Sequence, residues 1–302
     1  MPDGPDGGDR AGIVIPVGGH RLHVIDEGEG LSVLLMAALG SNWFDLDALT
    51  VRLLRQGFRV IRYDRPGYGL SSPRPPDEMP GLLDEVDRMR MVLDAVGVGG
   101  PVLIVGHSLA SLYVEAFGRV YPERSAGLVM VDGSFVLAPW RVVPARWGVR
   151  AAHRAVRVAQ SVTAAMGVHR WPSAGVWTLV VPPPPEGFTD DQRRWAGRVF
   201  GQPRFMTALL AENAVFATMD RDLRDLRRTH QLPDVPIDVV VASPRMPGWR
   251  HFWEWKQRRY AQTLITAAGV EAHVDVISPA RHFVVSQRPD EVAAIIGRMA
   301  GG

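Results

Sequence analysis

The sequence predicts a three-layer α/β sandwich, in which helices cover both faces of a mostly parallel central sheet. Short apolar runs of valine, leucine and isoleucine alternate with helix-length segments along the 302 residues, as in chains built from strand–helix–strand units. Most of these runs lack polar alternation, which is typical of strands buried on both faces. One early run does alternate polar and apolar residues and predicts an antiparallel edge strand.

The expected elements follow in chain order. The predicted strands are the edge strand at 20–26 and buried strands at 31–37, 58–64, 101–106, 128–132, 237–243 and 272–278. The predicted helices lie at roughly 43–56, 82–96, 109–120, 205–217, 250–268 and 288–299. Because parallel strands need crossover connections, we expect right-handed strand–helix–strand units.

One interval is far longer than a single crossover needs. About a hundred residues separate Asp132 from the next predicted strand. Five of the nine tryptophans fall inside this interval: Trp140, Trp147, Trp171, Trp177 and Trp195. We interpret 134–200 as a helical cap over the carboxyl ends of the strands, where open α/β sheets bind ligands. The core would then comprise 13–133 and 201–302, and the glycine- and proline-rich residues 1–12 are expected to be disordered.

The composition excludes several functional classes. The chain has no cysteine, and therefore no disulfide, thiolate metal site or thiol nucleophile. Its basic residues are all arginine except Lys256, yet the formal net charge is only +2, which does not indicate a nucleic-acid partner. The N-terminus lacks a signal-peptide pattern, and the apolar stretch 31–39 has about half the length of a membrane span. We therefore expect a cytoplasmic protein that acts on a small molecule.

The strongest candidate for a nucleophile is Ser108. The predicted strand 101–106 runs directly into HSLASLYVEAFGRV, which places this serine on a strand-to-helix turn. Gly106 and Ala110 flank it in a G-x-S-x-G pattern whose last glycine is alanine, and small residues there let the turn hold the serine in a strained conformation. The N-terminus of the following helix favours a developing oxyanion. A serine N-cap is the alternative, but the order of strand, turn and helix favours the nucleophile.

Three stretches together resemble the α/β-hydrolase family over roughly 15–300. They are VGHSLAS at 105–111, YDRPGYGLSS at 63–72 and ARHFVVSQRPDEV at 280–292. The second is similar to the family's turn after its fourth strand, and the third to the loop with the catalytic histidine. The resemblance implies an α/β-hydrolase fold with a serine nucleophile and the activity of a carboxylic ester hydrolase.

A serine nucleophile needs a general base, and nine histidines are candidates. His282 lies a few residues past the carboxyl end of the last predicted strand, where active-site loops gather. His107 is next to Ser108, but neighbouring residues on such a turn point in different directions. The resemblance also implies His282 as the base.

The third member of the site is an acid that orients the imidazole. The resemblance implies an aspartate just after the penultimate strand, but residues 239–252 contain no acid and Glu254 falls in a predicted helix. Some family members place the acid after the strand that follows the nucleophile helix, which is Asp132 here. The chain order Ser108, Asp132, His282 keeps the serine–acid–histidine order. We expect Asp132 to be the acid, with a turn-forming aspartate as the alternative.

The resemblance further implies two backbone donors for an oxyanion. Leu109 follows the nucleophile, and Leu39 follows the third strand, where Ala37 and Ala38 replace the expected His-Gly. A backbone N–H survives such side-chain changes, although the lost glycine narrows the shapes that the loop can adopt.

The cap segment is basic, with six arginines and no acidic residue between 134 and 185. Four of them follow helical spacing: Arg146, Arg150, Arg154 and Arg157. Such a helix can lie on a membrane or meet an anionic substrate, but a solvated face is more common, so we do not expect membrane contact. The histidines of HRLH at 20–23 point to opposite faces of a strand, and we predict no metal and no cofactor. The oligomeric state is not predicted.

The sequence thus predicts a capped serine hydrolase that cleaves a carboxylic ester or related acyl bond of a small, largely apolar substrate through an acyl-enzyme on Ser108. Lactones, thioesters and carbon–carbon bonds are cleaved by the same constellation and stay open. An aspartate-nucleophile dehalogenase or epoxide hydrolase is disfavoured because the elbow carries serine. A non-catalytic member that binds a small molecule under the cap is the alternative, supported by the missing His-Gly and the missing acid after the penultimate strand.

Overall fold

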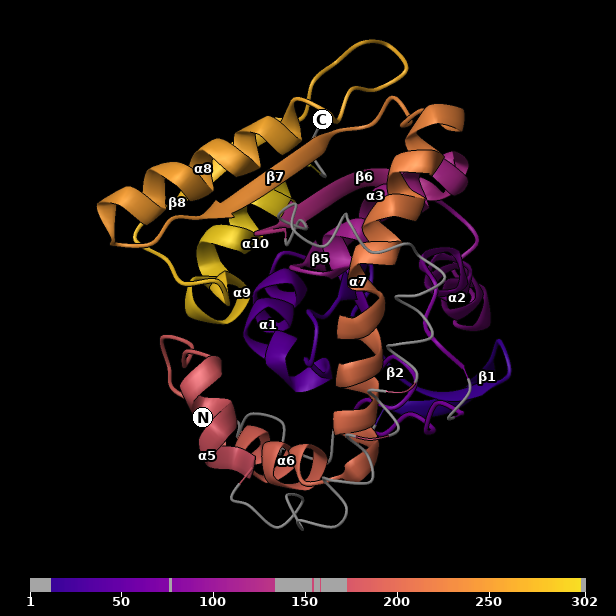
Figure 1. Ribbon diagram of the computed structural model, residues 1–302, viewed down its shortest axis with the longest axis vertical. Helices are drawn as coiled ribbons and strands as arrows, with labels where there is room; N and C mark the ends of the chain where they lie inside the picture. The colour runs from indigo at the N-terminus through magenta and orange to yellow at the C-terminus, as the bar shows by residue number, and fades with distance from the viewer. Residues whose placement is uncertain (1–11, 76–77, 134–153, 155–157, 159–172, 300–302) are drawn as a thin grey trace, which may run out of the picture.

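An eight-stranded sheet with the order β1-β2-β4-β3-β5-β6-β7-β8 crosses the computed structural model (Figure 1), which describes residues 12–75, 78–133, 154, 158 and 173–299. The strands are β1 (Ile13–Val17), β2 (His20–Glu27), β3 (Ser32–Met36), β4 (Arg59–Tyr63), β5 (Val102–His107), β6 (Ser125–Val131), β7 (Ile237–Ala242) and β8 (His273–Ile277). In the sheet order all neighbours from β4 to β8 pair in parallel. β2 pairs antiparallel with both of its neighbours, β1 and β4. This is the predicted α/β fold class with a mostly parallel sheet.

Helices cover both faces of the sheet (Figure 1). They are η1 (Trp43–Leu46), α1 (Asp47–Arg55), α2 (Leu82–Ala95), α3 (Ala110–Val120), η2 (Pro122–Arg124), α8 (Pro247–Ala261), α9 (Val284–Gln287) and α10 (Pro289–Arg298). Strand side chains alternate between the two faces. In β3, for example, Leu34 and Met36 pack in the core beneath α2, α3 and α8, while Val33 and Leu35 pack in the core beneath α1, α9 and α10.

The prediction of an edge strand at 20–26 is wrong in one respect. The strand exists as β2, but β1 pairs antiparallel outside it, with Ile13 opposite Val24. Two of the five residues of β1, Ile13 and Val14, are 56% and 43% exposed. Its residues IVIPV are all apolar, but Pro16 interrupts the run, and a proline inside a run argues against a strand or places it at an edge.

In the described part of the interval between β6 and β7 lie the helices α5 (Ser173–Val180), α6 (Asp190–Phe200) and α7 (Pro203–Thr229). They confirm an inserted helical region, although the boundaries 134–200 stay a prediction because most of 134–172 lies outside the described residues, as does the tail 1–11. Of the four arginines in the predicted stripe only Arg154 is described, and it is exposed. Membrane contact through this segment therefore stays untested.

α7 is longer than the helix predicted at 205–217, and it connects the inserted region to the core. Near its start it packs against α6, and further along it packs against α3 (Figure 1). Buried residues such as Phe205, Val215 and Leu223 occur along the whole helix, so burial supports it well beyond residue 217.

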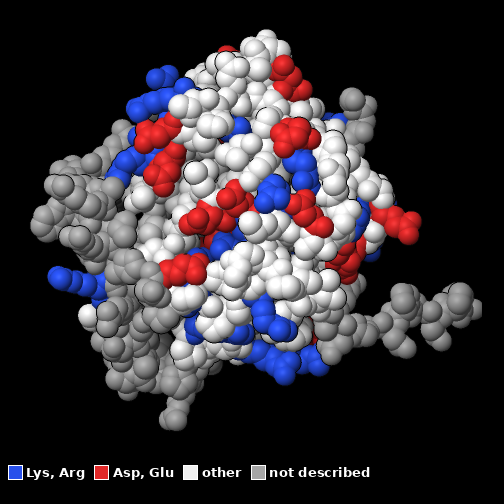
Figure 2. Space-filling view, turned by 90° about the vertical axis from the view of Figure 1, so that its right-hand side faces the viewer, with Lys and Arg blue, Asp and Glu red and all other residues white. Residues whose placement is uncertain are grey.

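No helix among the described residues is both long and apolar enough to cross a membrane. On the face over α2 and β1, acidic and basic side chains are interspersed rather than gathered by sign (Figure 2). Ion pairs among the described residues include Arg124 with Asp94, the latter on α2, and Arg59 with Asp26.

An aromatic cluster joins the inserted region to the core. The rings of Phe44 and Trp177 lie edge to face with centroids 5.8 Å apart, and Trp43 contacts Trp195 at 5.1 Å. At its centre Trp177 Nε1–H donates to Asp45 Oδ1 at 2.6 Å. Burial raises the pKa of Asp45 to about 7, although this hydrogen bond and one from a backbone N–H oppose the rise.

We expect the Asp45 carboxyl to make stability depend on pH. Because the folded-state pKa is raised from 3.8 to about 7, the folded protein binds more protons than the unfolded chain between these values. The stabilisation is fully present below pH 3.8 and is lost as the pH rises through about 7. Urea unfolding at pH 5 and pH 7.5 should therefore show a larger loss of unfolding free energy for the wild type than for Asp45→Asn. Equal losses would contradict this assignment.

Candidate active site

Ser108 lies on the sharp turn between β5 and α3. Its backbone φ is +58°, in the left-handed region that residues other than glycine rarely adopt. The turn requires Gly106, because a Cβ there would lie 2.5 Å from Val114 Cγ2 and 2.6 Å from the Ala110 carbonyl oxygen. The Ser108 N–H donates to the Val131 carbonyl oxygen at 2.9 Å and holds the strained backbone in place. The hydroxyl is thus presented at the carboxyl end of a central strand.

His282 joins two other predicted site residues in one hydrogen-bonded chain. Its Nε2 lies 2.9 Å from Ser108 Oγ, and its Nδ1 lies 2.6 Å from Asp132 Oδ2. Next to a carboxylate, a neutral imidazole carries its proton on Nδ1, which leaves Nε2 free to accept the serine proton. The side chain of His282 is 40% exposed and that of Asp132 only 2%, so the acid lies behind the imidazole. The geometry is that of a nucleophile, a base and a group that orients the base.

Two further donors fix the Asp132 carboxylate. Its Oδ1 accepts hydrogen bonds from Ala242 N–H at 3.0 Å and from Trp253 Nε1–H at 2.7 Å. Ala242 ends β7, the strand after which the family pattern has its acid, so this strand supports an acid that follows β6 instead. Glu254, the other carboxylate considered, accepts from a serine hydroxyl elsewhere. The structure therefore brings Asp132, and not Glu254, to the imidazole.

His107, which the sequence did not indicate as functional, supports the loop that carries His282. Its Nε2–H donates to the His282 carbonyl oxygen at 2.8 Å. Burial, together with the neighbouring imidazole, lowers the pKa of His107 to about 3, so this ring is neutral near pH 7. The two histidines are 175 positions apart in the chain, and no sequence signal identifies their contact.

The two predicted oxyanion donors leave neighbouring strands. Leu109 directly follows the serine after β5, and Leu39 lies in the loop after β3. β3 and β5 pair in parallel with Met36 opposite Gly106, so the two loops begin side by side. Within the described part of the chain, neither the Leu39 nor the Leu109 N–H donates to a protein acceptor. Their role as oxyanion donors stays a prediction.

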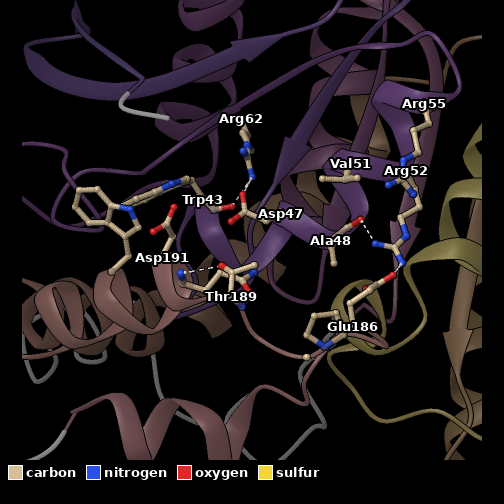
Figure 3. Close-up of a pocket in the computed structure, with 14 residues that line it drawn as sticks. Trp43, Asp47, Ala48, Val51, Arg52, Arg55, Arg62, Glu186, Thr189 and Asp191 are labelled. Atoms are coloured by element: carbon tan, nitrogen blue, oxygen red, sulfur yellow. Dashed lines mark hydrogen bonds and ion pairs between the residues drawn. The ribbon is translucent and has the colours of Figure 1, made fainter. Parts of the chain in front are cut away.

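A cavity of about 350 Å³ lies elsewhere, between η1, α1 and the segment leading into α6 (Figure 3). Its lining includes Arg52 and Arg62 but none of the hydrogen-bonded chain described above. Arg52 pairs with Glu186 and Asp290, and Arg62 pairs with Asp47. These ion pairs form part of the lining of the cavity, which lies between the inserted region and the core.

The family is decided by comparison with known proteins. Residues 10–295 match the model of the alpha/beta hydrolase family. The chain belongs to this family.

Curated relatives of this α/β hydrolase match only part of it. The chain is 30% identical over 137 residues to bifunctional epoxide hydrolase 2 of Mus musculus. The matched region covers 44% of this chain and 24% of that protein. It is 29% identical over 114 residues to 2-hydroxy-6-oxononadienedioate/2-hydroxy-6-oxononatrienedioate hydrolase of Comamonas testosteroni. This matched region covers 37% of this chain and 39% of that protein. The matched segments cover less than half of either relative.

Solved structures resemble nearly the whole α/β hydrolase. Epoxide hydrolase I of potato (Solanum tuberosum) superposes with a TM-score of 0.72 and 19% identity, over 96% of this chain and 98% of that chain. Cfl2 of Burkholderia cenocepacia superposes with a TM-score of 0.70 and 20% identity, over 94% and 93%. At this level of identity the likeness establishes the α/β-hydrolase fold.

Proposed function

We propose that this α/β hydrolase is a serine hydrolase that cleaves a carboxylic ester or related acyl bond. The observation that carries the proposal is the hydrogen-bonded chain from Ser108 through His282 to Asp132. A serine hydroxyl attacks a carbonyl at neutral pH only when a base removes its proton. Here His282 is the base, and its hydrogen bond to Asp132 favours the required tautomer.

In the proposed reaction Ser108 Oγ attacks the carbonyl carbon while His282 Nε2 takes the serine proton. Asp132 stabilises the resulting imidazolium, and the Leu39 and Leu109 N–H groups bind the oxyanion. His282 then returns the proton to the leaving alcohol, which leaves an acyl group on Ser108. Water, deprotonated by the same imidazole, releases this group as a carboxylic acid.

An apolar substrate is supported by the surroundings of the imidazole. The ring of Phe283 lies edge to face with that of His282, at a centroid distance of 5.7 Å. Phe283, like Leu209, packs against an apolar cluster between the core and the inserted region that includes Phe205. Side chains of this kind stabilise the apolar acyl or alcohol part of an ester.

Hydrolysis of a carbon–carbon bond next to a ketone is the second candidate. The relative from Comamonas testosteroni is named as a hydrolase of 2-hydroxy-6-oxo acids, which contain a keto carbonyl. Attack by Ser108 on a ketone would use the same base and oxyanion donors. An epoxide, the substrate class in the name of the mouse relative, has no carbonyl oxygen for those donors. Rates with aryl esters of increasing chain length, a lactone, a thioester, a 2-hydroxy-6-oxo acid and an epoxide would rank these classes, and we expect the esters to react fastest.

Covalent labelling tests the proposal directly. A fluorophosphonate probe should label the folded wild-type protein and fail to label Ser108→Ala, because only an activated serine reacts with it. Ser111→Ala is a matched control, since Ser111 is buried in α3 one turn away and should leave labelling unchanged. Intact-protein mass spectrometry gives the readout. A folded wild type without label would contradict the proposal and favour a protein that only binds a small molecule.

A further inference from the structure

The guanidinium of Arg65 holds the loop that carries Leu39. Its Nη1–H donates to the Ala37 carbonyl oxygen at 2.7 Å, and its Nη2–H donates to the Ala38 carbonyl oxygen at 2.9 Å. Arg65 follows β4 and is only 2% exposed. The two alanines stand where the family pattern has His-Gly. The conformation of this loop is therefore fixed from outside, by a side chain that binds two successive carbonyl groups.

Peptide geometry links this contact to the oxyanion donor. Ala38 C=O and Leu39 N–H belong to one planar trans peptide group, in which the two bonds point in opposite directions. By holding the Ala38 oxygen, Arg65 directs the Leu39 N–H away from the guanidinium. The Ser41 N–H also donates to the Ala38 oxygen, at 3.1 Å, so that oxygen has two donors. Rotation of this peptide group would break both hydrogen bonds.

The charge of Arg65 is balanced by a carboxylate on α7. Its Nε–H and Nη2–H donate to Glu212 on α7, at 2.7 Å and 3.0 Å, and Tyr68 Oη–H donates to the same carboxylate at 2.9 Å. Glu212 is 1% exposed. A buried guanidinium needs such a partner, and its planar fork reaches the carboxylate and both carbonyls at once. A lysine ammonium would carry the charge without this fork.

We propose that Arg65 and Glu212 form a positioning pair that orients the Leu39 N–H toward the oxyanion and connects it to helix α7. The inference rests on the proposed serine chemistry. Arg65 touches neither the nucleophile nor the base, so its effect is expected on transition-state stabilisation and not on substrate binding.

A second arginine–glutamate pair that involves the same helix provides a control. Arg227, near the end of α7, donates through Nε–H and Nη2–H to Glu115, both at 2.7 Å, and Tyr260 Oη–H donates to that carboxylate. Glu115 is fully buried in α3. This set repeats the arginine, glutamate and tyrosine of the first, with Arg119 as an additional donor to Glu115 at 2.9 Å. Among the described residues, its two arginines make no hydrogen bond to Ala37 or Ala38.

The test compares Arg65→Met and Arg65→Lys with Arg227→Met in the full-length chain. With 4-nitrophenyl butyrate, we expect Arg65→Met to lower kcat about 10²-fold or more with little change in KM, as for loss of one oxyanion donor. Arg65→Lys keeps the buried charge, so it should fold, and kcat should still fall about tenfold. Arg227→Met should lose less stability than Arg65→Met, because Arg119 still pairs with Glu115, and its kcat should stay within about twofold of the wild type. Equal kcat values in Arg65→Lys and Arg227→Met would overturn the inference.

Amide hydrogen exchange separates this inference from the proposed function. Peptides covering residues 37–41 should take up deuterium faster in Arg65→Lys than in the wild type, because the carbonyl that accepts from Ser41 N–H is released. This readout needs no turnover. If the wild type proves inactive but the loop still loosens, the hydrolase proposal fails, while the part of the inference by which Arg65 holds the loop of Leu39 stands. If turnover is present and exchange is unchanged, the positioning role fails.

Discussion

Replacing His282 with alanine should lower kcat for ester hydrolysis about 10⁶-fold, because Ser108 then has no base. The side chain is 40% exposed, so its removal costs little packing and the fold should persist. Steady-state kinetics with unchanged circular dichroism would check this. His251→Ala is a suitable control, since His251 is exposed on α8 and contacts only the carbonyl group of Pro247 among the described residues.

The two reacting residues should also behave as one unit. A Ser108→Ala/His282→Ala double variant is expected to be no slower than either single variant, because removing either residue already abolishes attack by the serine. Multiplicative losses in the double variant would mean that the two side chains act independently. The hydrogen bond of 2.9 Å between them argues for the first outcome.

Replacing Asp132 with asparagine should lower kcat about 10⁴-fold without unfolding the protein. The reason lies in the two donors on the far side of the carboxylate. Ala242 N–H and Trp253 Nε1–H both point at Oδ1, so an amide must turn its oxygen toward them. Its NH₂ group then faces His282 Nδ1, which must accept a hydrogen bond and therefore carries its proton on Nε2. An imidazole in that tautomer cannot take the serine proton.

Kinetics and structure together check this expectation. A crystal structure of Asp132→Asn should show the amide at an unchanged position, with Glu254→Gln as the comparison variant. Glu254→Gln should retain nearly full turnover, since Glu254 bonds to the hydroxyl of Ser243 and not to the imidazole. If Glu254→Gln abolishes turnover while Asp132→Asn is active, the acid has been misassigned.

The sequence predicts those parts of the molecule that depend on local patterns. Buried apolar runs indicate each central strand, because both faces of a parallel strand are covered. The serine turn is also local: the small flanking residues and the following helix all lie within a few positions of Ser108. The run IVIPV of β1 is apolar too, but it contains Pro16, and a proline inside a run argues against a strand or places it at an edge.

Contacts across the fold could not be predicted in the same way. Ala242 and Trp253 meet Asp132 from 110 and 121 positions away, and Arg65 meets Glu212 across 147 positions. Each depends on which strands become neighbours, and a single sequence does not encode that adjacency in any short motif. The sequence points to Asp132 only because residues 239–252 contain no acid, and the two donors that support its carboxylate depend on β6 and β7 being neighbours.

The long helix α7 has a consequence for altering substrate range. With 27 residues it is about 40 Å long, and it is attached to the core along that length. Arg204 bonds to the carbonyl groups of Gly69 and Ser71, and further along Glu212 and Arg227 make their buried pairs. A helix attached in this way is anchored to the core and does not move as a lid. Engineering that aims to admit bulkier esters should therefore vary α5 and α6 and leave α7 intact.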